Sequence, residues 1–104
     1  MNKYGLFPKE MQIIKEVLLP YKEKIDQIAL FGSRAMGTYK EGSDIDLVLY
    51  GELTEKEERR IGSEFQESSL VLNLDIKVYH LIGHKPLQEH IDKIKAVLDL
   101  NTAK

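Results

Sequence analysis

The chain has 104 residues, 15 basic and 17 acidic side chains that give a net charge of −2, and no cysteine. This length suits one domain with a single core, and the absence of cysteine excludes disulfides and thiolate metal sites while fitting a reducing cytoplasm. The charge balance provides no broad basic field for a nucleic-acid backbone, so nucleic acid is not an expected partner. No apolar run approaches the roughly 20 residues that cross a bilayer, and no signal peptide is evident. We therefore expect one cytoplasmic domain over residues 1–104.

The first half of the chain predicts two helices and two strands. A helix begins at Pro8 and ends before Pro20, because proline is accepted in a first helical turn but stops a helix further on. The apolar run Gln27–Phe31 predicts a strand that ends at a tight turn. A short helix over 33–38 and a polar loop follow, and the β-branched run Ile45–Tyr50 is the clearest strand.

The second half predicts a helix, a strand and a closing helix. Thr54 and Glu57 form the pattern of a capping box, which predicts a helix from there to about Glu67. A strand is expected within Leu70–Tyr79, and Pro86–Leu98 is predicted to close the chain as a helix with its apolar residues on one side. The predicted order is α-β-α-β-α-β-α. This is an α/β (α+β) fold in which helices flank a small mixed sheet.

Two carboxylates share one face of the clearest strand. Side chains alternate along a strand, so Asp44 and Asp46 point to one side while Ile45, Leu47 and Leu49 point to the other. Neighbouring carboxylates repel each other unless a proton or a cation neutralises them. Hard oxygen ligands on a rigid strand suit Mg²⁺, which completes its shell with water and phosphate oxygens. Two ordinary surface acids at a solvated strand end are the alternative.

A strand that ends in Gly32-Ser33 and opens a helix presents free backbone N–H groups to an anion. Gly32 has no side chain where a phosphate must approach the backbone. The Ser33 hydroxyl can bind a phosphate oxygen, and Arg34 adds positive charge nearby. A plain helix cap is the alternative, and neither the P-loop nor the dinucleotide-binding spacing is present.

A third acid lies in a later strand. In the segment 72–79, Leu72, Leu74, Ile76 and Val78 share one face, whereas Asp75 lies on the other. Aspartate is disfavoured inside a β-prone run, so it calls for a reason, and an exposed sheet face is the ordinary one. If this strand lies beside Ile45–Tyr50, the three carboxylates converge on one surface.

These residues together resemble the signature of the nucleotidyltransferase superfamily that includes DNA polymerase beta, kanamycin nucleotidyltransferase and the minimal nucleotidyltransferase (MNT) domains. That signature is Gly-Ser after the first strand, Asp-x-Asp on the second and Asp on a later strand. Here it reads Gly32-Ser33, Asp44-x-Asp46 and Asp75, in the context LFGSRA and GSDIDL. One departure is Met36, where many MNT members carry arginine; Lys40 is a nearby basic residue that the sequence alone cannot place.

The resemblance implies a reaction and a role for each residue. A nucleoside monophosphate, with AMP from ATP expected, would pass to an acceptor hydroxyl with release of pyrophosphate. Asp44 and Asp46 would hold two Mg²⁺ ions, and Asp75 would hold one of them and act as general base. Gly32 and Ser33 would bind the β- and γ-phosphates, with Arg34 and Ser43 in the same nucleotide-binding set.

The resemblance also implies a partner. Short MNT proteins are commonly encoded beside a small helical HEPN protein, and the pair resembles a toxin–antitoxin system in which the MNT member is the antitoxin. In some families it transfers AMP to a tyrosine of the HEPN protein. Because the chain ends soon after its last predicted helix, we expect no further domain that seats an acceptor. A HEPN-type protein is therefore the expected acceptor, and assembly with it or with a second copy is open.

Two other functions compete with this one. The chain could be a catalytically weak nucleotide-binding module that neutralises a HEPN partner by contact, or a transferase for a small molecule such as an antibiotic. A histidine metal site is not expected, because His80, His84 and His90 straddle Gly83 and Pro86 and share no helical face at metal-binding spacing.

Overall fold

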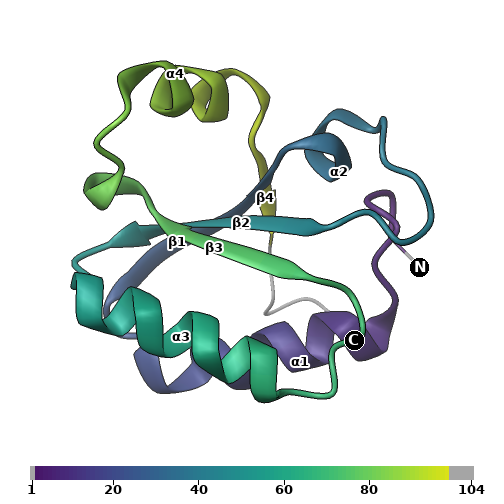
Figure 1. The fold of residues 1–104 in the computed structure, drawn as a ribbon, viewed down its shortest axis with the longest axis horizontal. Helices are drawn as coiled ribbons and strands as arrows, with labels where there is room; N and C mark the ends of the chain where they lie inside the picture. Colours follow the sequence, from purple (N-terminus) through teal and green to yellow (C-terminus); the bar gives the residue numbers. More distant parts are fainter. Residues whose placement is uncertain (1, 99–104) are drawn as a thin grey trace.

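A computed structural model describes residues 2–98. Four strands form one mixed sheet, with helices on both of its faces (Figure 1). Within the described residues, no helix is long and apolar enough to cross a membrane. The elements in chain order are α1 (Pro8–Leu18), the 3-10 helix η1 (Leu19–Tyr21), β1 (Ile25–Phe31), α2 (Ser33–Met36), β2 (Ile45–Gly51), α3 (Glu55–Glu67), β3 (Leu74–Val78), the 3-10 helix η2 (Tyr79–Leu81), α4 (Lys85–Ile94) and β4 (Ala96–Leu98).

The strand order across the sheet is β3-β2-β1-β4. Strand β2 runs antiparallel to β1 and parallel to β3, and β4 runs antiparallel to β1. The register sets Phe31 of β1 and Asp75 of β3 on either side of Asp46 in β2. The end of β1, the start of β2 and the start of β3 therefore meet at one end of the sheet.

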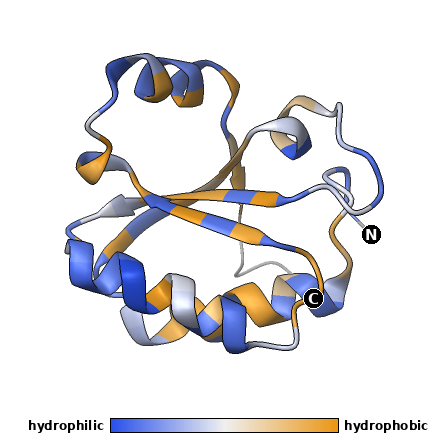
Figure 2. Ribbon diagram, viewed as in Figure 1, coloured by the Kyte–Doolittle hydropathy of each residue, from blue (hydrophilic) through white to orange (hydrophobic). Residues whose placement is uncertain are grey.

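Alternation along the strands separates the two faces of the sheet. Ile45, Leu47 and Leu49 are fully buried in the larger core, which α1 and α3 cover from below in Figure 1. On the opposite face Val48 packs in a smaller cluster with Ile91 of α4. Figure 2 shows the resulting colour change along β2 and β3, with hydrophobic and hydrophilic residues in turn. The predicted packing of Ile45–Tyr50 is confirmed.

The predicted starts of the first and third helices are confirmed. Helix α1 begins at Pro8, with the Glu10 carboxylate accepting from the Phe7 N–H at 2.8 Å. Helix α3 follows the Thr54–Glu57 capping box, in which the Thr54 hydroxyl accepts from the Glu57 N–H at 3.1 Å. The helix continues through Gly62, where an added β-carbon would lie 3.6 Å from the Ile76 side chain of β3, an ordinary packing distance.

The predicted closing helix is correct only to Ile94. Helix α4 ends there, and Ala96–Leu98 forms β4 instead, with Ile28 opposite Leu98 in the ladder. An apolar pattern does not reveal that β1 has an unpaired edge, and pairing with that edge satisfies backbone groups that a last helical turn would leave open. Leu98 is buried in the larger core, as a strand residue on that face should be.

Candidate active site

Three acids meet at one end of the sheet. Asp46 is half-buried in β2 and lies directly beside Asp75 in the parallel register with β3. Asp44 precedes β2, at an exposed position. The backbone N–H of Ile45, between Asp44 and Asp46, donates to the Asn73 carbonyl at 2.8 Å, which ties the start of β2 to the segment before β3. The convergence expected if the two strands were neighbours is therefore present.

The electrostatics of Asp46 reflect this crowding. Partial burial raises the pKa of Asp46 above its ordinary value, and the negative charges of Asp75 and then Asp44 raise it further. The positive charge of Lys77 opposes part of this rise in pKa. A carboxylate that is costly to ionise among its neighbours gains from a bound cation, so the donor set suits a hard divalent ion such as Mg²⁺.

The acids are close enough to shift the pKa of Asp46, but they do not form a complete set of metal ligands. Within residues 2–98, no three histidine or acidic side chains lie close enough to hold a metal ion as they stand. Lys77 also competes for one acid, since its Nζ lies 3.7 Å from Oδ2 of Asp75. A cation bound at Asp75 would share this carboxylate with Lys77.

The turn after β1 lies directly against these acids. Gly32 has φ 76° and ψ −157°, and a β-carbon placed there would overlap the Oδ2 atom of Asp46. Only glycine allows both the backbone conformation and the close approach. Ser33 then begins α2, and the first N–H groups of a helix have no partner within the helix. The loop therefore presents backbone donors next to the Asp46 carboxylate.

Arg34 has partners other than those expected from the sequence. Its side chain is only 3% exposed, and its guanidinium donates to the carbonyls of Tyr4 at 2.9 Å, Gly5 at 3.2 Å and Ser43 at 2.8 and 3.2 Å. The guanidinium also stacks over the Tyr39 ring at 5.1 Å. These contacts tie α2 to the N-terminal segment and to the residue before Asp44. Arg34 therefore holds α2 against the N-terminal segment and against Ser43, the residue before Asp44. We call this role a clip.

Ser43 serves the same loop. Its hydroxyl accepts from the Lys40 N–H at 2.8 Å, and its own N–H donates to the Lys40 carbonyl at 3.0 Å. With its carbonyl bound to Arg34, Ser43 is engaged in closing the turn that leads into Asp44. Lys40 is exposed in this turn, and Met36 is 53% exposed at the end of α2.

The family model described as Polymerase beta, Nucleotidyltransferase matches residues 12–101, which include the loop and all three acids. The chain belongs to this nucleotidyltransferase family. No curated protein sequence matches it significantly.

Solved structures share the fold of this nucleotidyltransferase. A chain of a toxin–antitoxin structure with AMP-PNP aligns with a TM-score of 0.68 and 20% identity, covering 84% of this chain and 70% of that one. A chain of the MntA–HepT toxin–antitoxin structure aligns with a TM-score of 0.62 and 17% identity, covering 84% and 67%. At these identities the likeness shows a common fold.

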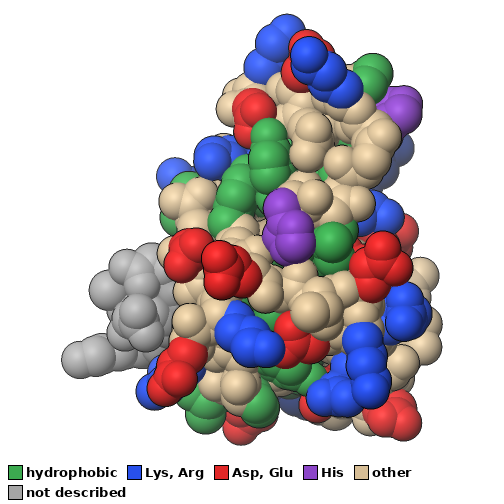
Figure 3. Space-filling view, turned by 90° about the vertical axis from the view of Figure 1, so that its left-hand side faces the viewer, with side chains coloured by type: hydrophobic (Ala, Val, Ile, Leu, Met, Phe, Trp, Pro, Cys, Tyr) green, Lys and Arg blue, Asp and Glu red, His purple; other side chains and the backbone are tan. Residues whose placement is uncertain are grey.

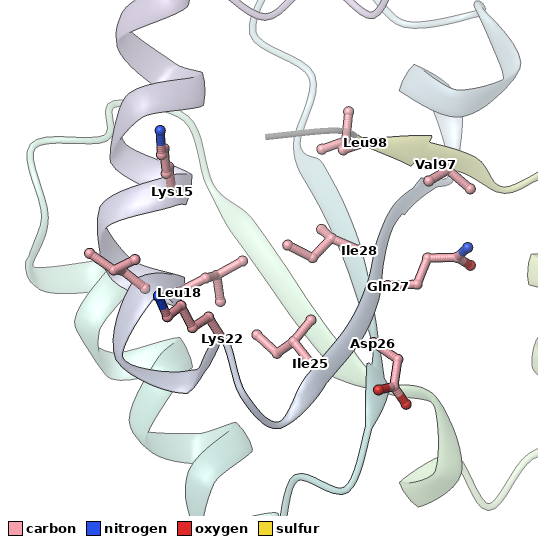
Figure 4. A pocket seen from close by; sticks show the side chains of 10 residues that line it. Lys15, Leu18, Lys22, Ile25, Asp26, Gln27, Ile28, Val97 and Leu98 are labelled. Atoms are coloured by element: carbon pink, nitrogen blue, oxygen red, sulfur yellow. The ribbon is translucent and has the colours of Figure 1, made fainter. Parts of the chain in front are cut away.

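Two hollows differ in their relation to the nucleotidyltransferase acids. One, of about 300 Å³, is lined by Asp44, Asp75 and the segment between α3 and β3. The other, of about 420 Å³, lies between α1, β1 and β4, with Leu18, Ile25 and Ile28 directed into it (Figure 4). None of the signature residues lines the larger hollow, whereas Asp44 and Asp75 line the smaller one.

The charged side chains on one face and two of the histidines have the following surroundings. On the face shown in Figure 3, acidic and basic side chains are interspersed, without a broad basic patch. His80 Nε2 lies 2.7 Å from the Leu53 carbonyl, and His84 caps α4 by accepting from the Leu87 N–H. These two histidines therefore have structural partners.

Two features near the site could not be assigned from the pattern alone. Strand alternation predicts that Lys77 lies on the same face of β3 as Asp75. It does not predict the ion pair between them, which depends on the side-chain conformations. The segment between α3 and β3 has no motif, and its place beside Asp44 follows only from the parallel pairing of β2 and β3.

Proposed function

We propose that this chain is a cytoplasmic, Mg²⁺-dependent nucleotidyltransferase that transfers AMP from ATP to a hydroxyl of a partner protein. The observation that carries the proposal is the position of Asp46, between Asp75 on the neighbouring strand and the Gly32 turn. Such a transfer needs a metal-binding carboxylate beside a phosphate-binding loop, and the closeness of Asp46 to Gly32 supports this assignment.

Each residue of the signature has a proposed part. Asp44 and Asp46 hold the metal, and Asp75 completes the ligand set once its pair with Lys77 opens. The N–H groups after Gly32 and the Ser33 hydroxyl bind the terminal phosphates. Bound Mg²⁺, two ions by analogy with the family, supplies neutralisation of the phosphates and of the developing charge. Arg34 and Ser43 hold the loop and the acids in position and are not proposed to touch phosphate.

The proposed step is an in-line displacement. The acceptor hydroxyl oxygen forms a bond to the α-phosphorus of ATP, and the bond from that phosphorus to the pyrophosphate oxygen breaks. Asp75 takes the hydroxyl proton. AMP remains on the acceptor and pyrophosphate leaves.

We propose further that the acceptor belongs to a HEPN-type toxin and that this chain is its antitoxin. The support is the fold shared with chains from toxin–antitoxin structures, one of them determined with AMP-PNP.

Labelled ATP tests the proposal directly. The chain is incubated with Mg²⁺, ATP labelled at the α-phosphate and a HEPN-type protein from the same genome. We expect label on the HEPN-type protein with wild type and none with Asp46→Asn, a substitution that removes a charge without changing size. Absence of label with wild-type protein that binds ATP would contradict transfer.

A second function is favoured by one observation. Because no three-ligand metal cluster is preformed within residues 2–98, the chain could bind a nucleotide and neutralise its partner by contact alone. Neutralisation of the toxin by Asp46→Asn as well as by wild type would favour this second function. Loss of neutralisation in that variant, with partner binding retained, favours transfer.

A further inference from the structure

The hollow beside the acids has an apolar floor and a polar rim. Phe65 is buried in the larger core, and Leu70, Leu72 and Leu74 pack against that core. The rim carries exposed residues from three sources, the end of α3, the loop 68–73 and the two acids: Gln66, Val71, Asn73, Asp44 and Asp75. The apolar residues that line the hollow are therefore held in place by the larger core.

Hydrogen bonds fix the loop 68–73 at both ends. At the end of α3 the Ser68 hydroxyl donates to the Phe65 carbonyl at 2.6 Å and accepts from the Leu70 N–H at 3.2 Å. At the other end the Asn73 carbonyl accepts from the Ile45 N–H at 2.8 Å, immediately beside Asp44. The loop is thus held at a set distance from the acids.

Val71 projects from the middle of this fixed loop. Its side chain is 94% exposed, although the leucines on either side of it are turned toward the core. A single exposed apolar residue is unremarkable on a surface. This one, however, lines the same hollow as two of the three acids.

The acids divide the site into two sides. Asp46 lies against Gly32, on the side of the phosphate-binding turn. Asp44 and Asp75 line the hollow, which does not include Gly32 or Asp46. A nucleotide bound at the turn would leave the hollow lined by Asp44 and Asp75 free for another molecule.

We propose that this hollow seats the acceptor, and that the loop 68–73 recognises the partner segment that carries the hydroxyl. The segment presents its hydroxyl to Asp75, packs an apolar side chain on Val71, and offers hydrogen-bonding groups to Gln66 and Asn73. It is not acidic, because Asp44 and Asp75 repel a negative segment. This inference rests on the proposed transferase function and adds how the acceptor is chosen.

Matched substitutions test the seat. Val71→Ser removes the apolar contact without adding charge, and Val97→Ser makes the same change at a half-exposed valine of β4 outside the hollow. AMP transfer to the HEPN-type protein, affinity for that protein and affinity for Mg²⁺–ATP are measured for both. We expect Val71→Ser to lower kcat/KM for the partner at least fivefold with ATP affinity within twofold, and Val97→Ser to match wild type.

Two results would overturn the seat. One is transfer by Val71→Ser at the wild-type rate; the other is an equal loss in Val97→Ser. If wild type binds ATP and the partner but transfers nothing, the transferase proposal fails. The affinity for the partner then shows whether the hollow beside Asp75 binds it. In that case a fivefold weaker complex with Val71→Ser alone supports the seat, and unchanged affinity overturns it.

Discussion

Gly32 and Asp46 lie so close together that a β-carbon on the glycine would overlap the carboxylate of the aspartate. Gly32 follows the last residue of β1 and Asp46 lies in β2, and the pairing of Phe31 with Asp46 in the antiparallel register brings the two together. The contact joins the proposed phosphate loop to the proposed metal ligand. The two halves of the signature thus form one site through strand register.

The first prediction concerns this contact. Gly32→Ala should abolish ATP binding and cost about 1–3 kcal/mol of stability, because both the positive φ and the neighbouring carboxylate oppose a side chain. Gly37→Ala is the matched control: it has a similar φ of 78° but no heavy atom within 4 Å of a β-carbon. It should cost about 1 kcal/mol and keep ATP binding. Urea unfolding and calorimetric titration measure both, and equal ATP affinities in the two variants would contradict the account.

The second prediction concerns Arg34. Arg34→Met should destabilise the chain by roughly 2–4 kcal/mol, because three carbonyls lose a charged donor in a buried place. Arg34→Lys should recover little of this, since an ammonium cannot reproduce the forked geometry. Urea unfolding provides the measurement.

The control for Arg34 is an exposed arginine. Arg59→Met removes only a surface pair with Glu55 at 3.8 Å and should change stability by less than about 0.5 kcal/mol. If Arg34→Lys instead kept full stability and lost ATP affinity, Arg34 would be a phosphate ligand and not a clip.

The third prediction follows from the raised pKa of Asp46. In the metal-free protein at neutral pH, Asp46→Asn should raise Tm, because the ionised carboxylate is disfavoured by burial, Asp75 and Asp44. A raised folded-state pKa favours folding below the ordinary value of 3.8, and this contribution is lost as pH rises through the folded-state pKa. The Tm advantage of the variant should therefore shrink as pH falls and wild-type Asp46 takes up its proton.

Thermal scans in EDTA at pH 7 and near pH 4 measure the Tm difference between the Asp46→Asn variant and wild type. A variant less stable than wild type at pH 7 would contradict the raised pKa. Added Mg²⁺ should stabilise wild type more than the variant, since the cation binds the carboxylate.

The fourth prediction compares two stacked tyrosines. The rings of Tyr50 and Tyr79 lie 4.7 Å apart, with Lys95 Nζ 4.5 Å from the Tyr50 centroid. Within residues 2–98 the buried Tyr50 hydroxyl has no hydrogen-bond partner, whereas that of Tyr79 donates to Asp92 of α4 at 2.9 Å. Tyr50→Phe should leave stability unchanged or raise it by about 1 kcal/mol, and Tyr79→Phe should lower it by about 0.5–1 kcal/mol. Urea unfolding that reverses this order would contradict the assignment.

Local chemistry accounts for the parts of the fold that the sequence predicted. Proline at the start of α1, the Thr54–Glu57 box of α3 and the alternation around Ile45–Tyr50 each act within a few residues. The glycine, the serine and the three acids were recognised as a set through their resemblance to the family signature. Their convergence depended on β2 and β3 being neighbours, which no single segment specifies.

Long-range pairing explains what the sequence could not predict. Strand β4 looks like the end of a helix until the free edge of β1 is known. Arg34 was expected in the phosphate-binding set because it follows Ser33. Its guanidinium instead donates to the carbonyls of Tyr4 and Gly5, which lie 30 and 29 residues earlier in the chain. The hollow beside Asp75 could not be predicted for the same reason, because the loop 68–73 has no motif and lies beside the acids only through the pairing of β2 with β3.

Asp46 and the Gly32 turn are proposed to form one Mg²⁺–nucleotide site, which is the central claim. Calorimetric titration of ATP into wild type and Asp46→Asn, each with Mg²⁺ and with EDTA, tests it most directly. We predict that Mg²⁺ strengthens ATP binding to wild type at least tenfold and has little effect on the variant. Binding to wild type that ignores Mg²⁺, or an equal Mg²⁺ effect in Asp46→Asn, would contradict the claim.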